Sequence, residues 1–158
     1  MLGDQLSVQR IEDVFELSEK LLQATDALTG HAADLGGLPA AHYVNMAGRN
    51  RMLSQRIGKF FLFREWPSLD EKIAVLTPPS CHEFESNLQT LRKTANIPPE
   101  VAAQLRVVAS QWQKFIQTLC PDLSHAARTQ HARLVIAEGE RLLRSVDTTV
   151  KLFERLTK

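Results

Sequence analysis

The chain has little of the chemistry on which most enzymes depend. It contains five histidines and two cysteines in 158 residues. His125 and His131 are six residues apart and therefore lie on different faces of one predicted helix, unlike the i, i+4 pair of a helical zinc site. There is no Glu-x-x-His pair for a di-iron centre, no Cys-x-x-Cys and no haem-attachment motif. We therefore expect no enzymatic activity, no cofactor and no metal centre. Solvated or capping roles are expected for the histidines, which are His31, His42, His82, His125 and His131.

The sequence also lacks the marks of a nucleic-acid or membrane protein. Its formal net charge is +1, whereas a nucleic-acid-binding domain is normally strongly basic. No apolar run approaches the roughly 18 residues that cross a bilayer, and residues 1–9 lack the basic start and apolar stretch of a secretion signal. We expect no nucleic-acid partner and no membrane insertion by this chain. The expected location is cytoplasmic if Met1 is the native start, and periplasmic or otherwise extracytoplasmic if the chain was trimmed from a longer one.

The apolar pattern predicts one all-α domain over residues 1–158, an antiparallel bundle of four to five helices. With 44% hydrophobic residues the chain is large enough to bury a sizeable core. Apolar residues recur at helical spacing, and glycines and prolines cluster at a few breaks. Capping boxes formed by Ser68 with Glu71 and by Ser80 with Glu83 predict two helix starts. The predicted helices, including a short one, span residues 8–33, 39–65, 69–76, 81–94, 98–119 and 124–156.

Aromatic residues at helical spacing are expected in the core. They are Phe60, Phe84, Trp112 and Phe115. Cys81 and Cys120 fall toward one end of an antiparallel helix pair, but counting from the intervening turn leaves Cys120 roughly 12 Å beyond its mate. Two half-buried thiols are therefore expected, with a disulfide as the alternative.

The first predicted helix resembles the last one. Residues 14–26, VFELSEKLLQATD, match residues 135–147, VIAEGERLLRSVD, in Val, Glu, a Lys/Arg, Leu-Leu and Asp. The segment 1–36 therefore resembles the end of a preceding unit, as in tandem helical repeats. Two amphipathic helices can also match through their pattern alone.

The most unusual segment, residues 45–59, places four cations and no carboxylate on one predicted helix. One face is a strip of mostly small or polar residues, with Ala47 and Ser54 beside it. The strip consists of Val44, Gly48, Arg51, Gln55, Gly58 and Leu62. Glycine lowers helix stability, so glycines on both sides of Arg51 indicate the close approach of another backbone. The Arg51 guanidinium offers an oxyanion a planar fork of donors.

Two further faces complete this helix. The core-facing stripe consists of Met46, Leu53, Ile57 and Phe60. A third face, suited to plain solvent, consists of Arg49, Met52, Arg56 and Lys59. The alternative interpretation of the whole segment is a charged surface helix that binds no ligand. For Arg56 alone, the alternative to a ligand contact is an ion pair with a carboxylate of the bundle.

The string from Val44 to Lys59 closely resembles the signature of the PilJ-type family, the N-terminal sensor domain of type IV pili methyl-accepting chemotaxis transducers. The resemblance continues through residues 82–91 and 98–119. It implies a bacterial helical sensor bundle. A related motif occurs in membrane nitrate and nitrite sensor kinases, in which the arginine before the methionine contacts the anion between the motif helices of two subunits. By position, that arginine is Arg51.

The motif departs from the nitrate-sensor version at several positions. Gly48, Arg51, Met52, Ser54 and Arg56 fit that version, whereas Arg49-Asn50, Leu53 and Gln55 belong to the transducer version. The motif also lies on the second predicted helix, whereas in a membrane sensor it would follow a transmembrane segment.

The leading hypothesis is a non-enzymatic sensor that dimerises through the strip and binds a small oxyanion such as nitrate or nitrite at Arg51. Two close guanidinium groups repel each other unless an anion bridges them. The second contacts are expected from Asn45, Gly48, Arg49, Ser54, Gln55 and Arg56. The signal would leave through an unidentified signalling protein. The alternative is a scaffolding bundle whose motif docks the acidic side chains of a partner protein and binds no small molecule.

Overall fold

The computed structural model describes the backbone of residues 2–36, 39–119 and 125–156, and the side chains of residues 8–27, 41–119 and 131–156. This part of the chain is all-α, which confirms the predicted fold class. Its elements are α1 (Leu2–Gly36), α2 (Pro39–Phe63), the 3-10 turn η1 (Pro67–Leu69), α3 (Asp70–Lys93), α4 (Pro99–Thr118) and α5 (His125–Arg155). Among the described helices, none has both the length and the apolar character needed to cross a membrane.

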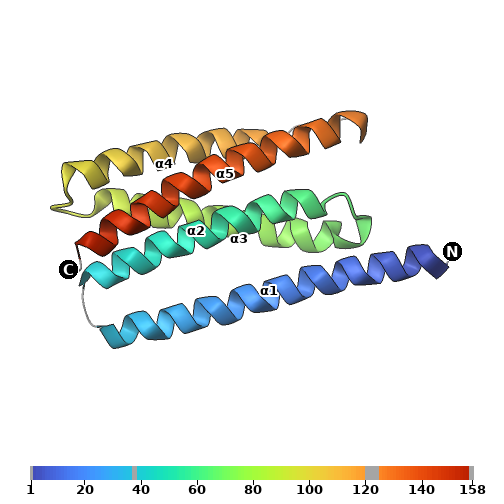
Figure 1. Cartoon of the computed structure of the whole chain (residues 1–158), viewed down its shortest axis with the longest axis horizontal. Coiled ribbons are helices and arrows are strands. Elements are labelled where there is room, and N and C mark those ends of the chain that lie inside the picture. The colour runs from blue at the N-terminus through green and yellow to red at the C-terminus, as the bar shows by residue number, and fades with distance from the viewer. Residues whose placement is uncertain (1, 37–38, 120–124, 157–158) are drawn as a thin grey trace.

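Helices α2 to α5 form an up-down-up-down bundle (Figure 1). Helix α5 returns to pack against both α2 and α4, and α3 packs against α2 and α4. Helix α1 lies outside this bundle, along α2 and on the far side from α4 and α5 (Figure 1). The motif helix α2 is therefore shared between the bundle and α1.

The bundle core is centred on aromatic side chains of α3 and α4. The rings of Phe84 and Trp112 stack with their centroids 4.0 Å apart. The Trp112 indole donates a hydrogen bond of 3.0 Å from Nε1 to Glu85 Oε1, so its polar atom is satisfied despite burial. All four predicted core aromatics, including Phe60 and Phe115, are at most 1% exposed, which confirms the prediction.

A second apolar cluster attaches α1 to one end of the bundle. Phe15 of α1 is buried, with its ring centroid 5.9 Å from that of Phe60 and 5.3 Å from that of Phe63. Leu69 of η1 and Ile73 of α3 complete the buried part of this cluster. Farther along α1, polar contacts with α2 predominate.

The predicted break between residues 76 and 81 is wrong, because α3 continues through Pro78 and Pro79. Proline lacks an N–H and crowds the preceding turn, which usually ends a helix. Here residues on both sides of the prolines, Ile73, Phe84 and Leu88, are buried. Helical stability in proteins comes mainly from such tertiary packing, which outweighs local propensity.

Both predicted capping boxes are also wrong. Helix α3 has Leu69 at its N-cap and no side-chain capping bond there, so Ser68 does not cap it. Ser80 lies inside α3 and is 1% exposed; its hydroxyl donates a 2.8 Å bond to the Leu76 carbonyl. The Thr77 hydroxyl donates likewise to the Ile73 carbonyl, at 2.7 Å. These hydroxyls bond back into the helix instead of starting a new one.

The remaining sequence predictions have mixed outcomes. The helices predicted over 39–65, 98–119 and 124–156 are confirmed, whereas the first helix begins earlier than predicted, at Leu2. Cys81 is half-buried, but Cys120 lies outside the described residues, so the disulfide question stays a prediction. The His131 ring bonds the Thr118 carbonyl at the end of α4, which is a capping role.

We expect Pro79→Ala to raise the free energy of unfolding by up to about 3 kcal/mol, because alanine restores the missing N–H and removes the crowding inside α3. Urea denaturation followed by circular dichroism measures the change. Pro99→Ala is the matched control, because the first position of α4 needs no N–H donor; its change should stay within about 0.5 kcal/mol. A loss of stability in Pro79→Ala would contradict this account.

Candidate functional site

The motif residues 45–59 lie wholly within α2, and their four cations divide between two sides of the helix. Arg49, Arg56 and Lys59 meet carboxylates of α1 or α3, whereas Arg51 lies beside α5. The sequence segment contains no carboxylate, but the fold brings carboxylates to it.

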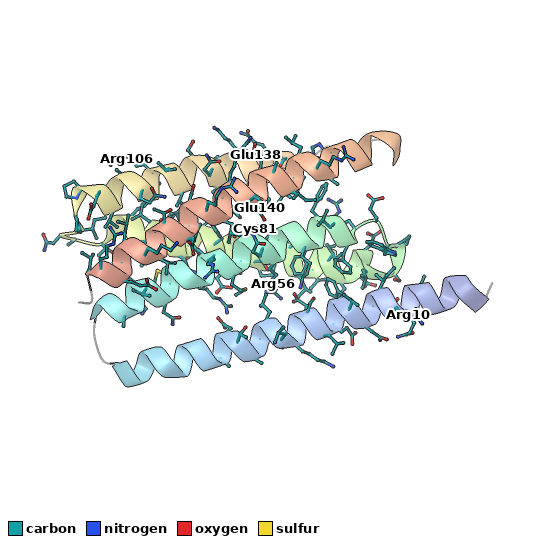
Figure 2. The ribbon with its side chains drawn as sticks, viewed as in Figure 1. Arg10, Arg56, Cys81, Arg106, Glu138 and Glu140 are labelled. Atoms are coloured by element: carbon teal, nitrogen blue, oxygen red, sulfur yellow. The ribbon has the colours of Figure 1, made fainter. Side chains whose placement is uncertain are left out.

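Arg56 and Lys59 share one carboxylate, that of Glu19 on α1. Glu19 Oε2 accepts bonds of 2.5 Å from Arg56 Nη2 and 3.1 Å from Arg56 Nε, and Oε1 accepts a bond of 2.6 Å from Lys59 Nζ. Lys59 also donates to Ser18 Oγ at 2.9 Å. Figure 2 shows Arg56 between α2 and α1. The alternative in which Arg56 holds a carboxylate of its own chain is confirmed, although that carboxylate belongs to α1, which packs beside the four-helix bundle.

Glu19 is 7% exposed, and this burial acts on its pKa in the opposite direction to its two partners. Desolvation raises the pKa of Glu19, but the hydrogen bonds and positive charges of Arg56 and Lys59 outweigh it and hold the pKa below the usual value. The carboxylate is therefore ionised at neutral pH.

Arg49 connects three helices. Its Nε donates a bond of 2.5 Å to Glu83 Oε1 of α3, and its Nη1 pairs with Asp26 of α1. The hydrogen bond that Arg49 donates to Glu83 is the main cause that raises the pKa of Arg49 above its usual value. Arg49 is thus held by carboxylates of its own chain on both sides.

Arg51 has a different environment. Its side chain is 57% exposed, and its Nε lies 3.7 Å from Asp147 Oδ1 of α5. Asp147 is held more closely by Lys151, whose Nζ is 2.7 Å from Oδ2. The hydrogen bond from Lys151 is the largest cause that lowers the pKa of Asp147, and the charge of Arg51 contributes least. The guanidinium of Arg51 therefore retains most of its donors for solvent or a ligand.

The strip around Arg51 is partly covered by the chain itself. A Cβ at Gly48 would meet no atom within 4 Å, and Gln55 is exposed. By contrast, a Cβ at Gly58 would lie 3.7 Å from the Phe115 ring, so this glycine faces the bundle. Ser54 is 1% exposed and donates a 2.7 Å bond to the Arg51 carbonyl. The stretch around Gly48, Arg51 and Gln55 is open to a ligand, and Gln55 and Gly58 also line a hollow of about 330 Å³ between α2 and α5.

The remaining predicted contact, Asn45, is half-buried on α2, one turn before Arg49. The fold does not gather the predicted residues at one point. Arg49 and Arg56 bind carboxylates of α1 and α3, whereas Arg51 and Gln55 are exposed to solvent.

The sequence analysis missed Asn50, a buried polar residue on the core-facing stripe. Asn50 is 2% exposed; its Nδ2 donates 3.1 Å to the Phe84 carbonyl, and its Oδ1 accepts a 3.1 Å bond from Asn87. The missed signal was its spacing, because Asn50 continues the series of Met46, Leu53 and Ile57. A satisfied buried amide of this kind fixes the register between two helices, here α2 and α3.

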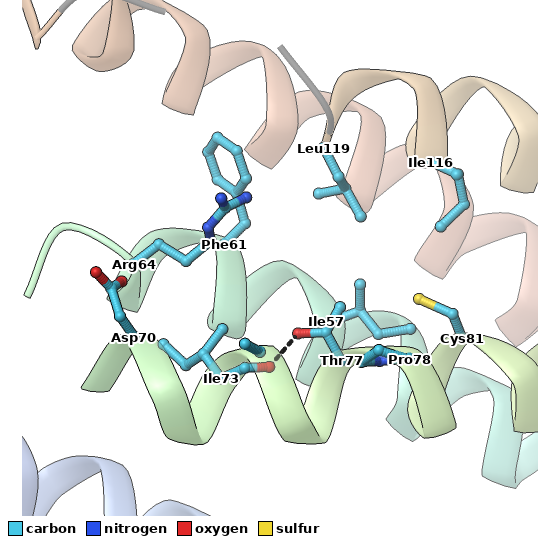
Figure 3. Close-up of a pocket in the computed structure, with 11 residues that line it drawn as sticks. Ile57, Phe61, Arg64, Asp70, Ile73, Thr77, Pro78, Cys81, Ile116 and Leu119 are labelled. Carbon is cyan, nitrogen blue, oxygen red and sulfur yellow. Dashed lines mark hydrogen bonds between the residues drawn. The ribbon is translucent and has the colours of Figure 1, made fainter. Parts of the chain in front are cut away.

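A hollow lined by Ile57 of the motif and by residues outside the motif was also not predicted. It has a volume of about 450 Å³ and opens between α2, α3 and α4 (Figure 3). Its lining is mostly aliphatic or aromatic, with Arg64 and Asp70 at one end (Figure 3). None of the predicted site residues lines it. In the part of the chain that the structure describes, no group of three or more His, Cys, Asp or Glu residues is arranged to hold a metal ion.

Comparison with known proteins identifies the family. The family model of the type IV pili methyl-accepting chemotaxis transducer N-terminal domain, PilJ, matches residues 37–142. This is more than half of the chain, which therefore belongs to the PilJ family, a class of sensor and signalling domains. The matched region begins after α1 and ends within α5. No curated protein and no solved structure matches the chain.

We expect Glu19→Gln to lower the free energy of unfolding at neutral pH by about 1–3 kcal/mol, because it leaves Arg56 and Lys59 without their shared charge. The matched control is Glu16→Gln. Glu16 pairs with Lys72 at 2.9 Å, but both side chains are about half exposed and the pair is screened by solvent, so the loss should be clearly smaller than in Glu19→Gln. Equal losses in the two variants would contradict this account.

Glu19→Gln also tests the pH dependence of stability. Because the folded pKa of Glu19 lies below its unfolded value of about 4.3, its stabilisation is complete above that value and is lost as the pH falls through the folded pKa. Acid titration of the free energy of unfolding should therefore show a smaller decrease below about pH 4.3 in Glu19→Gln than in the wild type. If the free energy of unfolding falls equally with acid in Glu19→Gln and in the wild type, Glu19 is not the titrating group.

Proposed function

We propose that this PilJ-family domain is a non-enzymatic sensor that binds a small oxyanion, such as nitrate or nitrite, at Arg51. One contrast carries the proposal. Arg49, Arg56 and Lys59 each have a carboxylate within hydrogen-bond distance, whereas Arg51 is 57% exposed and lies 3.7 Å from Asp147. Among the motif cations, Arg51 has the most donor capacity left for a ligand.

The surroundings of Arg51 favour a small ligand. Gly48 lies about one turn before Arg51 and has open space where a side chain would be, so an anion can approach the helix backbone there. Gln55 lies about one turn after Arg51 and is exposed, and its amide supplies a further donor. The proposed contacts are therefore Arg51, Gln55 and the backbone edge at Gly48.

The other predicted contacts are assigned different roles. Arg49 and Arg56 hold carboxylates of α1 and α3, and the Ser54 hydroxyl is bonded within α2. Asn45 is half-buried one turn before Arg49, and we assign it no contact with the ligand. We propose that Arg49 and Arg56 position the helix and do not bind the ligand.

The proposed signal is a change in the contact between α2 and α5. An anion at Arg51 competes with Asp147, which keeps Lys151 as its partner when Arg51 turns away. Ligand binding then alters one of the polar links between these two helices, and an unidentified signalling protein detects the change. We also propose that the domain lies in the periplasm or otherwise outside the cytoplasm.

A homodimer through the motif helix stays a prediction. In it, two copies bring their Arg51 side chains to one anion. Gly58 faces Phe115 of α4 inside the bundle, so the stretch from Gly48 to Gln55 is the part of the strip that we assign to a second copy.

The second candidate function is a scaffold whose motif docks an acidic partner protein. It is favoured by the way Arg49 and Arg56 already bind carboxylates of neighbouring helices, because an acidic helix of another protein offers Arg51 the same chemistry. Such a scaffold binds no small oxyanion.

Thermal denaturation with nitrate, nitrite, sulfate or phosphate, at fixed ionic strength against chloride, separates these functions. A ligand at one hundred times its Kd stabilises the fold by about 2.7 kcal/mol, and Arg51→Ala should abolish that gain. Arg144→Ala is the matched control: Arg144 is 69% exposed and lies 3.7 Å from Glu140, so its removal should leave the response intact. If none of the four anions stabilises the wild type, the oxyanion proposal fails and the scaffold is favoured.

The competition with Asp147 gives a further expectation. Asp147→Asn removes the competing negative charge, so the Kd for the anion that stabilises the wild type should fall up to about fivefold. Isothermal titration with that anion measures the change. Weaker binding in Asp147→Asn would mean that Asp147 helps to form the site instead of competing for Arg51.

A further inference from the structure

The outward face of α1 carries a row of large apolar side chains. Val14, Leu17 and Leu21 are 57%, 64% and 67% exposed. Their spacing of three and then four residues is that of the a and d positions of a coiled coil. On the opposite side of α1, Phe15 and Glu19 are buried against the bundle. Exposure of three consecutive seam positions goes beyond the scattered apolar residues of an ordinary surface.

The resemblance between α1 and α5 shows what such a face normally does. In the alignment of residues 14–26 with 135–147, these three residues correspond to Val135, Glu138 and Leu142 of α5. Those three are 1%, 8% and 0% exposed, because α5 packs this face against α2 and α4. Helix α1 therefore presents to solvent the face that its counterpart buries inside the bundle.

The charges beside the row indicate what covers it. Asp13 and Lys20 lie seven residues apart on one flank of the row, and both are exposed. Suppose that two α1 helices pair antiparallel, with Val14 of each beside Leu17 of the other. Asp13 of each copy then lies beside Lys20 of the other, which gives two equivalent ion pairs. In a parallel pair, Asp13 and Lys20 instead face Ser18 and Thr25, which carry no charge.

We propose that two copies of this chain associate antiparallel through Val14, Leu17 and Leu21 of α1. This interface goes beyond the proposed anion binding and does not depend on it, because Arg51 faces α5 and α1 lies on the far side of α2 from α5. It is also a different surface from the motif-helix strip, so one set of variants distinguishes the two dimers.

Sedimentation equilibrium of the whole chain tests the interface. The wild type should be a dimer, and the double variant Leu17→Gln, Leu21→Gln should be a monomer that keeps its helical circular dichroism. The control double variant Val75→Gln, Val107→Gln replaces exposed valines of α3 and α4, which are 68% and 45% exposed, and should remain a dimer. A monomeric wild type, or a leucine variant that still dimerises, would overturn the proposal.

Charge reversal tests the antiparallel arrangement. Asp13→Lys and Lys20→Asp should each raise the dimer Kd about tenfold, because each turns two attractive pairs into repulsive ones. The double variant Asp13→Lys, Lys20→Asp restores both pairs and should return the Kd to within about twofold of the wild type. A double variant that associates no better than the single variants would overturn the arrangement.

Variants of the motif strip supply the remaining comparison. Gln55→Glu and Arg51→Ala should leave the dimer Kd unchanged, whatever their effect on nitrate binding. If either of them abolishes the dimer while the leucine variant retains it, the interface lies on α2 and the α1 proposal fails. Loss of nitrate binding with an intact dimer would concern Arg51 alone, so the two proposals fail separately.

Discussion

The carboxylate of Glu19 determines how α1, α2 and the motif are arranged. It is nearly buried, and both Arg56 and Lys59 donate to it. A buried carboxylate without such partners would cost several kcal/mol, so α1 can lie here only with this face of α2 toward it. That orientation turns Arg51 toward α5 and leaves its side chain largely exposed. The accessibility of Arg51 is thus a consequence of where its neighbouring cations find their counterions.

Much of the fold could be predicted from periodicity. The aromatic core and three long helices follow from apolar spacing, since 3.6-residue periodicity determines which side chains share a face. The region around Pro78 and Pro79 could not be predicted, because local rules place a helix end there. What overrides those rules is the burial of Ile73 before the prolines and of Phe84 after them, and this packing is visible only in the folded chain.

The candidate site was less predictable than the fold, for an electrostatic reason. The sequence shows four cations and no carboxylate between residues 45 and 59, which on its own indicates an unfilled anion site. The partners Glu19, Asp26 and Glu83 are each more than twenty residues from the cations that they bind, and no periodicity connects them. Among the predictions for these cations, only the alternative in which Arg56 holds a carboxylate of the bundle included a partner from a distant part of the sequence. For Arg51 the sequence and the structure agree, because the side chain is exposed and the neighbouring Gly48 leaves open space beside it.

Helix α1 is held to α2 by two kinds of contact that respond differently to solution conditions. Around Phe15 the contact is apolar and does not depend on pH or salt in the way that ion pairs do. Farther along, Glu19 and Asp26 bind cations of α2, and these contacts require ionised carboxylates. The half-exposed pair of Glu16 with Lys72 is screened by salt, whereas Glu19 is shielded from solvent and is screened much less. High salt therefore leaves α1 in place, but protonation of Glu19 removes the charge that two cations share. A second copy that packs on the outer face of α1 adds apolar contacts that protonation does not remove, so dimer formation would make the position of α1 less dependent on pH.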